Sequence, residues 1–237
     1  MYGARSPKNE LMRALVLQHG TDEPAGHVSA WLRERGVSED VWRIDRHRGE
    51  PDPGDYDVVV SLGSERAAYD DSVPWLGREV ELLRGAYDTE VPVLGICFGA
   101  QLLARALGGR AMRSAHPEIG WVPITTRAPA LVPAGPWLQW HYDTFTVPPG
   151  GSLLAESPAG PQAFVIGRSL GVQFHPEVTP QIVGSWVAGA GDRLARDGVD
   201  PERVLAETLE RDGENRERAW CLLDAFVERV ARLRDAA

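Results

Sequence analysis

Residues 91–101 read Val91-Pro92-Val93-Leu94-Gly95-Ile96-Cys97-Phe98-Gly99-Ala100-Gln101. The apolar run predicts a buried strand, and the residues after Cys97 favour a helix. A cysteine between two glycines at such a junction is typical of a nucleophile elbow, a sharp strand-to-helix turn that exposes the side chain. The positive end of the following helix stabilises a thiolate. The stretch therefore favours a cysteine that attacks a carbonyl, although a small buried hydrophobe is the commoner role of a free cysteine.

A second motif places a histidine and a carboxylate two residues apart. It reads Gly171-Val172-Gln173-Phe174-His175-Pro176-Glu177-Val178 and ends another strand-like run. Because positions i and i+2 of an extended segment point the same way, Glu177 can hold the His175 imidazole in one tautomer while the ring faces the thiol. Alone, His175 also fits a strand-end histidine and Glu177 a solvated turn residue. Together with Cys97 they favour a nucleophile, base and orienting acid, the parts of a catalytic triad.

The rest of the pattern predicts an α/β fold. In the first half of the chain, apolar runs alternate with helical periodicity, as a doubly wound sheet requires. Between residues 110 and 171 short strands with frequent Pro and Gly turns predict an antiparallel extension, and the chain from residue 180 is helical with breaks near 198–201 and at Gly213. Besides the strand before Cys97, we expect strands at 13–18, 40–44, 57–62, 120–126, 151–156, 163–167 and 171–174, and helices at 24–35, 74–87 and 100–107. The predicted fold is a mostly parallel sheet with flanking helices and a small antiparallel extension.

Length and composition fit one domain. The 237 residues, 43% of them hydrophobic, suffice for a single core over residues 1–237, with a helical cover from about 180 to 237. Acidic residues outnumber basic ones by 34 to 25, a net charge of -9, which argues against a nucleic-acid or anionic-membrane surface. Residues 1–9 carry no apolar export signal, and no run approaches the roughly 18 apolar residues of a membrane span.

The two cysteines, Cys97 and Cys221, do not make a disulfide framework. Cys221 lies in the amphipathic stretch 216–234, where we expect it to be buried. Together with the absence of an export signal, this predicts a cytoplasmic location.

With both motifs in view, the chain resembles the class I, triad-type glutamine amidotransferases, and among them free-standing proteins similar to the glutaminase half of GMP synthase. The elbow around Cys97 and the His-Pro-Glu motif at 175–177 are highly specific together. Residues 61–64 (Ser-Leu-Gly-Ser), 118–121 (Glu-Ile-Gly-Trp) and 140–143 (Trp-His-Tyr-Asp) add support. The resemblance runs along nearly the whole chain and implies the flavodoxin-like fold of this family.

Such an enzyme needs donors for an oxyanion. The amide of Phe98, the residue after the nucleophile, is the usual first donor. Gly63 is the predicted second: it follows strand 57–62, and by resemblance it matches the second glycine of the family's Gly-Gly turn. Leu62 replaces the first glycine. If Leu62 cannot adopt the backbone conformation of that glycine, we expect the oxyanion site to form only when substrate or a partner binds. Without the resemblance, Gly63 fits an ordinary turn glycine equally well.

The resemblance also implies a glutamine site. It assigns Gln101 to contact with the glutamine and the backbone near Tyr142 and Asp143 to its amino-acid end. By helix position alone, a solvent-facing Gln101 is the commoner fate. Tyr142 departs from the family, where this position is generally small, so its ring either narrows the pocket or points outward. His141 and Asp143 lack any recognisable metal-ligand spacing, and we expect no metal.

The chain has no phosphate-binding or dinucleotide-binding glycine motif, so we expect no cofactor and assign activation of the ammonia acceptor to another protein. The leading hypothesis is a glutaminase that forms a cysteine thioester and supplies ammonia to a synthetase or transferase partner in trans. One alternative is a hydrolase of γ-glutamyl amides or peptides that acts alone. The other is a catalytically silent regulatory subunit of the same fold.

Overall fold

Nine strands form one sheet in the computed structural model. The structure describes residues 12–233, and the polar stretch 1–9 lies outside the described residues. The strands are β1 (Arg13–Gln18), β2 (Ser38–Arg43), β3 (Val58–Ser61), β4 (Val93–Ile96), β5 (Ala111–Thr126), β6 (Gly135–Phe145), β7 (Ser152–Ser157), β8 (Gly160–Ile166) and β9 (Ser169–Val172). Their order across the sheet is β2-β1-β3-β4-β9-β8-β7-β5-β6. The pairings from β2 to β9 are parallel, and those from β9 to β6 are antiparallel.

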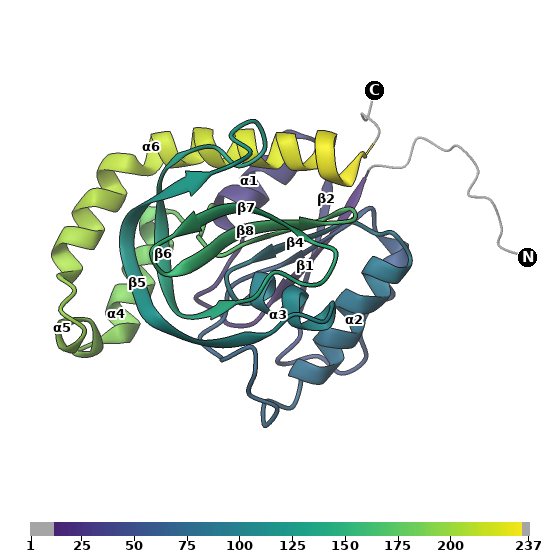
Figure 1. Cartoon of the computed structure of the whole chain (residues 1–237), viewed down its shortest axis with the longest axis horizontal. Coiled ribbons are helices and arrows are strands. Elements are labelled where there is room, and N and C mark those ends of the chain that lie inside the picture. Colours follow the sequence, from purple (N-terminus) through teal and green to yellow (C-terminus); the bar gives the residue numbers. More distant parts are fainter. Residues whose placement is uncertain (1–11, 234–237) are drawn as a thin grey trace, which may run out of the picture.

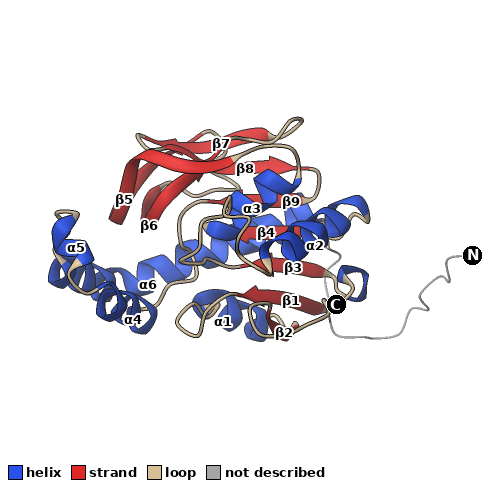
Figure 2. Ribbon diagram, turned by 90° about the horizontal axis from the view of Figure 1, so that it is seen from below, coloured by secondary structure: helices blue, strands red, loops and turns tan. Residues whose placement is uncertain are grey.

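Helices cover both faces of the parallel half (Figure 2). They are α1 (Gly26–Glu34), α2 (Leu76–Asp88), α3 (Phe98–Ala106), α4 (Pro180–Ala190), α5 (Arg193–Arg196) and α6 (Pro201–Ala225), with a 3-10 turn η1 (Pro53–Asp55) and a π-helical end η2 (Phe226–Ala231). Alternate residues of each strand face opposite layers. Val58 and Val60 of β3 pack in the core beneath α1, α6 and η2, whereas Val59 packs in the core beneath α2 and α3.

A third, smaller core lies at the antiparallel half. Leu138 of β6 packs there with Ile182 and Val183 of α4 and with Val204 of α6. Figure 1 shows α6 running along this side of the molecule, with α4 and α5 at its lower end. Residues 180–231 thus join the antiparallel strands to the parallel layer.

The predicted fold class is confirmed, but the antiparallel half is larger than predicted. Strand β5 begins nine residues before the expected start at 120, and β6 was not expected at all. Two polar side chains of β6, Gln139 and His141, are buried, and Gln139 donates a hydrogen bond to Gln162 of β8. Inward-facing polar residues obscure the apolar alternation by which a half-buried strand is recognised.

Two expectations for the helical region are wrong. The break near 198–201 exists, because α6 begins at Pro201 with Asp200 as its N-cap, but no break occurs at Gly213, which lies inside α6. Cys221 is exposed rather than buried, since it lies on the solvent side of α6 while its neighbours Leu222 and Leu223 face the core. Within residues 12–233, no helix combines the length and apolar character needed to cross a bilayer.

Gly213 offers a test of the uninterrupted α6. It is exposed, and nothing lies within 4 Å of a Cβ added there, so Gly213→Ala adds helix propensity without a clash. We expect the free energy of unfolding, measured by urea denaturation, to rise by about 0.5–1 kcal/mol. The matched control is Gly36→Ala, also exposed and open but at φ +66°, which should lower stability by about 1 kcal/mol. A loss of stability in Gly213→Ala contradicts a continuous helix.

Candidate active site

Cys97 occupies a strained turn between β4 and α3. Its φ of 51° and ψ of -106° lie outside the regions that non-glycine residues normally adopt. The flanking glycines allow this turn because they have no side chain where the backbone is closely packed, and not because they adopt positive φ values. A Cβ on Gly99 would lie 2.1 Å from the Ser61 carbonyl oxygen, and a Cβ on Gly95 would lie 2.7 Å from the Gly99 carbonyl. The elbow predicted from the glycine-cysteine-glycine pattern is therefore present in the backbone.

His175 and Glu177 form a buried pair next to this turn. His175 Nδ1 lies 2.7 Å from Glu177 Oε1, and both side chains are 4% exposed. Glu177 is thus not a solvated turn residue. Its carbonyl accepts a 2.8 Å hydrogen bond from the His27 N–H at the start of α1, and the His175 N–H donates to the Leu138 carbonyl of β6. These backbone bonds fix both residues of the motif.

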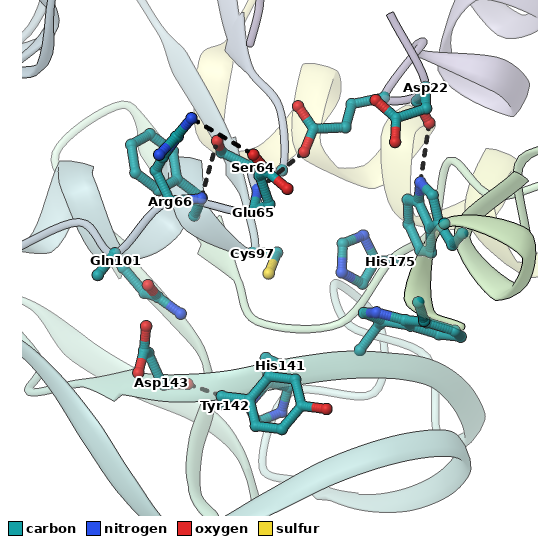
Figure 3. Close-up of a pocket in the computed structure, with 18 of the residues that line it drawn as sticks. Asp22, Ser64, Glu65, Arg66, Cys97, Gln101, His141, Tyr142, Asp143 and His175 are labelled. Atoms are coloured by element: carbon teal, nitrogen blue, oxygen red, sulfur yellow. Dashed lines mark hydrogen bonds and ion pairs between the residues drawn. The ribbon is translucent and has the colours of Figure 1, made fainter. Parts of the chain in front are cut away.

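The imidazole of His175 lies beside the Cys97 sulfur (Figure 3). The two residues are brought together by the parallel pairing of β4 with β9, in which Ile96 is opposite Val172. Burial disfavours a charged ring, but the Glu177 carboxylate and the Cys97 sulfur outweigh it and hold the pKa of His175 well above its usual value. The edge of the ring contacts Trp186 of α4, with centroids 4.8 Å apart. The geometry favours an imidazolium facing a sulfur in a site shielded from water.

Gly63 lies at the same rim. A Cβ added to it would be 3.1 Å from His175 Cε1 and 3.9 Å from Cys97 Cβ, so the glycine leaves space for the imidazole. Leu62, the residue before Gly63, is buried and is not among the non-glycine residues with positive φ in the described range. Its carbonyl accepts a 3.1 Å hydrogen bond from Gly99. Leu62 therefore fits an ordinary backbone conformation here.

A pocket of about 330 Å³ opens at this rim. Seven of the eight predicted site residues line it, namely Gly63, Cys97, Phe98, Gln101, Tyr142, Asp143 and His175, and Glu177 supports His175 from behind. Gln101 is 3% exposed, so it is not the solvent-facing helix residue that its position alone favours.

Tyr142 points into the pocket wall rather than outward. Two guanidinium groups contact its ring: the Cζ atoms of Arg113 and Arg193 lie 4.8 and 4.0 Å from the ring centroid. Its hydroxyl donates to the Asp197 carboxylate, which ties β6 to the segment after α5. The neighbouring Asp143 accepts a 3.1 Å hydrogen bond from Tyr69. Tyr142 thus forms part of one side of the pocket.

Two residues that the sequence analysis missed, Gln173 and Trp186, have side chains in contact with Cys97 or His175. Gln173 is fully buried, its Nε2 lies 3.5 Å from Cys97 Sγ, and its Oε1 accepts a 3.2 Å hydrogen bond from Gln101. The same i, i+2 alternation that linked His175 to Glu177 extends back to Gln173 and would have indicated it. Trp186 covers His175 and donates to the Asp22 carbonyl, and no local signal distinguishes it from a core tryptophan.

His141 lines the pocket, and its Nδ1 lies 3.0 Å from the Asp143 carbonyl oxygen. Its buried Nε2 has no hydrogen-bond partner among the described residues and lies 3.4 Å from Glu118 Oε2. Among residues 12–233, no group of three or more His, Cys, Asp and Glu side chains is arranged to hold a metal ion.

Solved structures share this architecture. A glutamine amidotransferase from Thermotoga maritima superposes with a TM-score of 0.85 at 29% identity, covering 92% of this chain and 99% of that one. A glutamine amidotransferase from Methylobacillus flagellatus gives a TM-score of 0.86 at 28% identity, covering 92% and 95% of the two chains.

Sequence comparisons point the same way. The chain is 38% identical over 176 residues to a GMP synthase [glutamine-hydrolyzing] of Thermus thermophilus, covering 67% of this chain and 33% of that protein. It is 28% identical over 250 residues to the enzyme of the same name from Bordetella avium, covering 94% and 41%. The chain thus spans only about a third to two fifths of the length of these relatives. The model of the family described as glutamine amidotransferase class-I matches residues 27–187, and the chain belongs to this family.

Proposed function

We propose that this protein hydrolyses the side-chain amide of glutamine through a thioester on Cys97 and supplies the ammonia to a partner enzyme. The observation that carries the proposal is the buried 2.7 Å contact between His175 and Glu177, held beside a cysteine on a strained elbow. A nucleophile, a base and an acid that orients the base are what amide cleavage by a cysteine requires.

The first half of the reaction breaks the carbon–nitrogen bond. The Cys97 thiolate attacks the side-chain carbonyl carbon, and the oxygen takes up the negative charge within reach of the Phe98 and Gly63 amides. When the tetrahedral intermediate collapses, the nitrogen takes the proton of the His175 imidazolium and leaves as ammonia. Gln173, whose Nε2 lies 3.5 Å from the sulfur, supports the thiolate before attack.

The second half releases glutamate. His175, now neutral, removes a proton from water as the water attacks the thioester carbonyl, and the second intermediate collapses to glutamate and the Cys97 thiolate. Glu177 keeps the ring oriented and stabilises its charge in both halves. The shielding of the imidazole by Trp186 keeps bulk water away from the charged pair.

Glutamine itself is bound by the rest of the pocket. Gln101 supplies a polar side chain near the amide, and the backbone at Tyr142 and Asp143 is the proposed partner of the amino-acid end. Arg113 and Arg193, which contact the Tyr142 ring, put positive charge at the same wall, suited to a carboxylate.

The proposed partner is a synthetase that acts in trans. The chain's matches cover 33% and 41% of two relatives named GMP synthase [glutamine-hydrolyzing], and most of the length of those relatives lies outside the matched residues. Copurification with an interacting protein tests this: we expect that protein to consume the ammonia and to change the glutaminase rate. Full activity alone, unaltered by every interacting protein, argues against a partner.

The size of the pocket also admits a second candidate substrate. Its volume of about 330 Å³ lies at the lower end of the range, roughly 300–1,000 Å³, of small-molecule sites. The alternative is a γ-glutamyl amide whose leaving group is an amine rather than ammonia. Comparison of kcat/KM for glutamine and for γ-glutamyl-alkylamines separates the two, because a hydrolase that acts alone turns over the substituted amide at least as well.

The nucleophile is tested by covalent labelling. A glutamine-like diazo-ketone should alkylate Cys97 with loss of nitrogen, giving one adduct by intact mass, and Cys97→Ala should give none. Cys221 provides a matched control because it is exposed and is not among the residues that line the pocket. Cys221→Ala should retain both the adduct and the glutaminase rate, and an adduct confined to Cys221 would contradict the proposal.

The role of Glu177 is tested by pH dependence. The carboxylate raises the pKa of His175, so its removal in Glu177→Gln lowers that pKa and the imidazolium is lost at lower pH. We expect the basic limb of the kcat/KM profile to move toward acid and kcat to fall by about 10²–10⁴-fold. A variant with an unchanged basic limb would show that Glu177 does not set the protonation state of His175.

A further inference from the structure

A second buried histidine–carboxylate pair lies on the other side of the elbow. His19, just after β1, has Nε2 2.8 Å from Glu79 Oε2 of α2, and both side chains have no exposed surface. Ser61 of β3, also fully buried, donates a 2.7 Å hydrogen bond to the other oxygen of Glu79. The mechanism above uses none of these three residues. The imidazole packs against two aromatic rings: Trp75, stacked with centroids 5.1 Å apart, and Phe98, in an edge contact at 4.8 Å.

The remaining nitrogen of His19 reaches the rim of the pocket. Its Nδ1 lies 2.8 Å from the carbonyl oxygen of Gly63, the residue proposed to donate to the oxyanion. The Gly63 N–H belongs to the preceding peptide, whose Leu62 carbonyl accepts one hydrogen bond, from Gly99 N–H. A glycine has wide freedom in φ and ψ, so the contact of His19 with the Gly63 carbonyl restrains the residue from its other side and limits how far the Gly63 N–H can turn.

The charge state of the cluster follows from its contacts. Both ring nitrogens of His19 face acceptors, the Gly63 carbonyl and the Glu79 carboxylate, so both bonds form together only when both nitrogens carry protons. Burial disfavours the charged ring, but Glu79, with a smaller contribution from Glu23, outweighs it and raises the pKa of His19. Trp75 and Phe98, the rings packed against the imidazole, bring no charge.

We propose that His19, held by Glu79, which Ser61 holds in turn, is a positioning residue that keeps the Gly63 backbone in the orientation needed to stabilise the oxyanion over Cys97. The inference rests on the proposed glutaminase function. His19 touches no reacting atom and acts through the Gly63 carbonyl. Its loss therefore weakens transition-state stabilisation while leaving the thiolate and the binding of glutamine in place.

The two nitrogens of His19 can be tested separately with residues of similar size. When their side chains are superposed on a histidine side chain, the amide nitrogen of asparagine lies at the position of Nδ1, and that of glutamine lies at the position of Nε2. Both replacements are made in a Glu79→Gln background, so that no unpaired carboxylate is left buried. Glu79→Gln alone is the reference for both double variants, because in it neutral His19 can still donate from Nδ1 to the Gly63 carbonyl while Nε2 accepts from the new amide.

The expected result is a difference between the double variants. His19→Asn with Glu79→Gln keeps a donor for Gly63 and should retain kcat within about tenfold of the Glu79→Gln background, whereas His19→Gln with Glu79→Gln should lose a further ~10²-fold, with KM little changed. Alkylation of Cys97 by iodoacetamide, measured in Cys221→Ala protein, needs no oxyanion site and should proceed at the same rate in both. Rates are compared well below each variant's thermal midpoint.

The outcomes separate the two proposals. Equal kcat values for the Asn and Gln double variants overturn the positioning role while leaving the glutaminase intact. A loss of Cys97 alkylation that parallels the loss of kcat also overturns it, because the defect then lies in the sulfur rather than in the oxyanion site. Wild-type protein that turns over no glutamine, alone or with its partner, overturns the proposed function and the inference with it.

Discussion

The close approach of α3 to β3 is the constraint on which the site depends. Gly99 lies so near the Ser61 carbonyl that a single added carbon would be 2.1 Å from the oxygen. Because the helix starts this close to the neighbouring strand, the chain has to turn within one residue, and Cys97 takes up the strained φ of 51°. Packing of the buried helix against both strands offsets that strain, which is of order 1–3 kcal/mol. The position of the sulfur is thus set by backbone contacts and not by its own rotamer.

The order of the strands brings the other groups to the same place. In the sheet, β3, β4 and β9 are neighbours and run parallel, so their carboxyl ends meet at one edge, where ligands bind in open α/β sheets. Gly63 follows β3, Cys97 follows β4, and Gln173 and His175 follow β9. The antiparallel half adds the opposite wall, since the Leu138 carbonyl of β6 binds the His175 N–H. A pocket built from four separated segments is therefore anchored by backbone hydrogen bonds within one sheet.

The sequence was informative where structure follows from neighbours in the chain. The elbow could be predicted because Gly95 and Gly99 flank Cys97, and the pairing of His175 with Glu177 because i and i+2 share a side of an extended segment. What was missed depends on distant contacts. Strand β6 lacks a clear apolar alternation because Gln139 is buried, and its partner Gln162 comes from another strand. Gly213 stays helical because the packing of α6 outweighs the low helix propensity of one exposed glycine. His19 gave no signal, since its partners lie 44 and 60 residues away.

The buried pair of His19 and Glu79 is hard to explain by stability alone. Removing both charged groups from water costs several kcal/mol per ion, and apolar residues of similar volume commonly pack as stably. The surrounding core of Leu17, Trp75 and Phe98 would accept such residues. What an apolar pair cannot do is satisfy the Ser61 hydroxyl and the Gly63 carbonyl, which border the elbow from two sides. The buried charged pair thus lies where it can hold the backbone next to Cys97 in place. This placement argues that the pair of His19 and Glu79 maintains the geometry of the site rather than the stability of the fold.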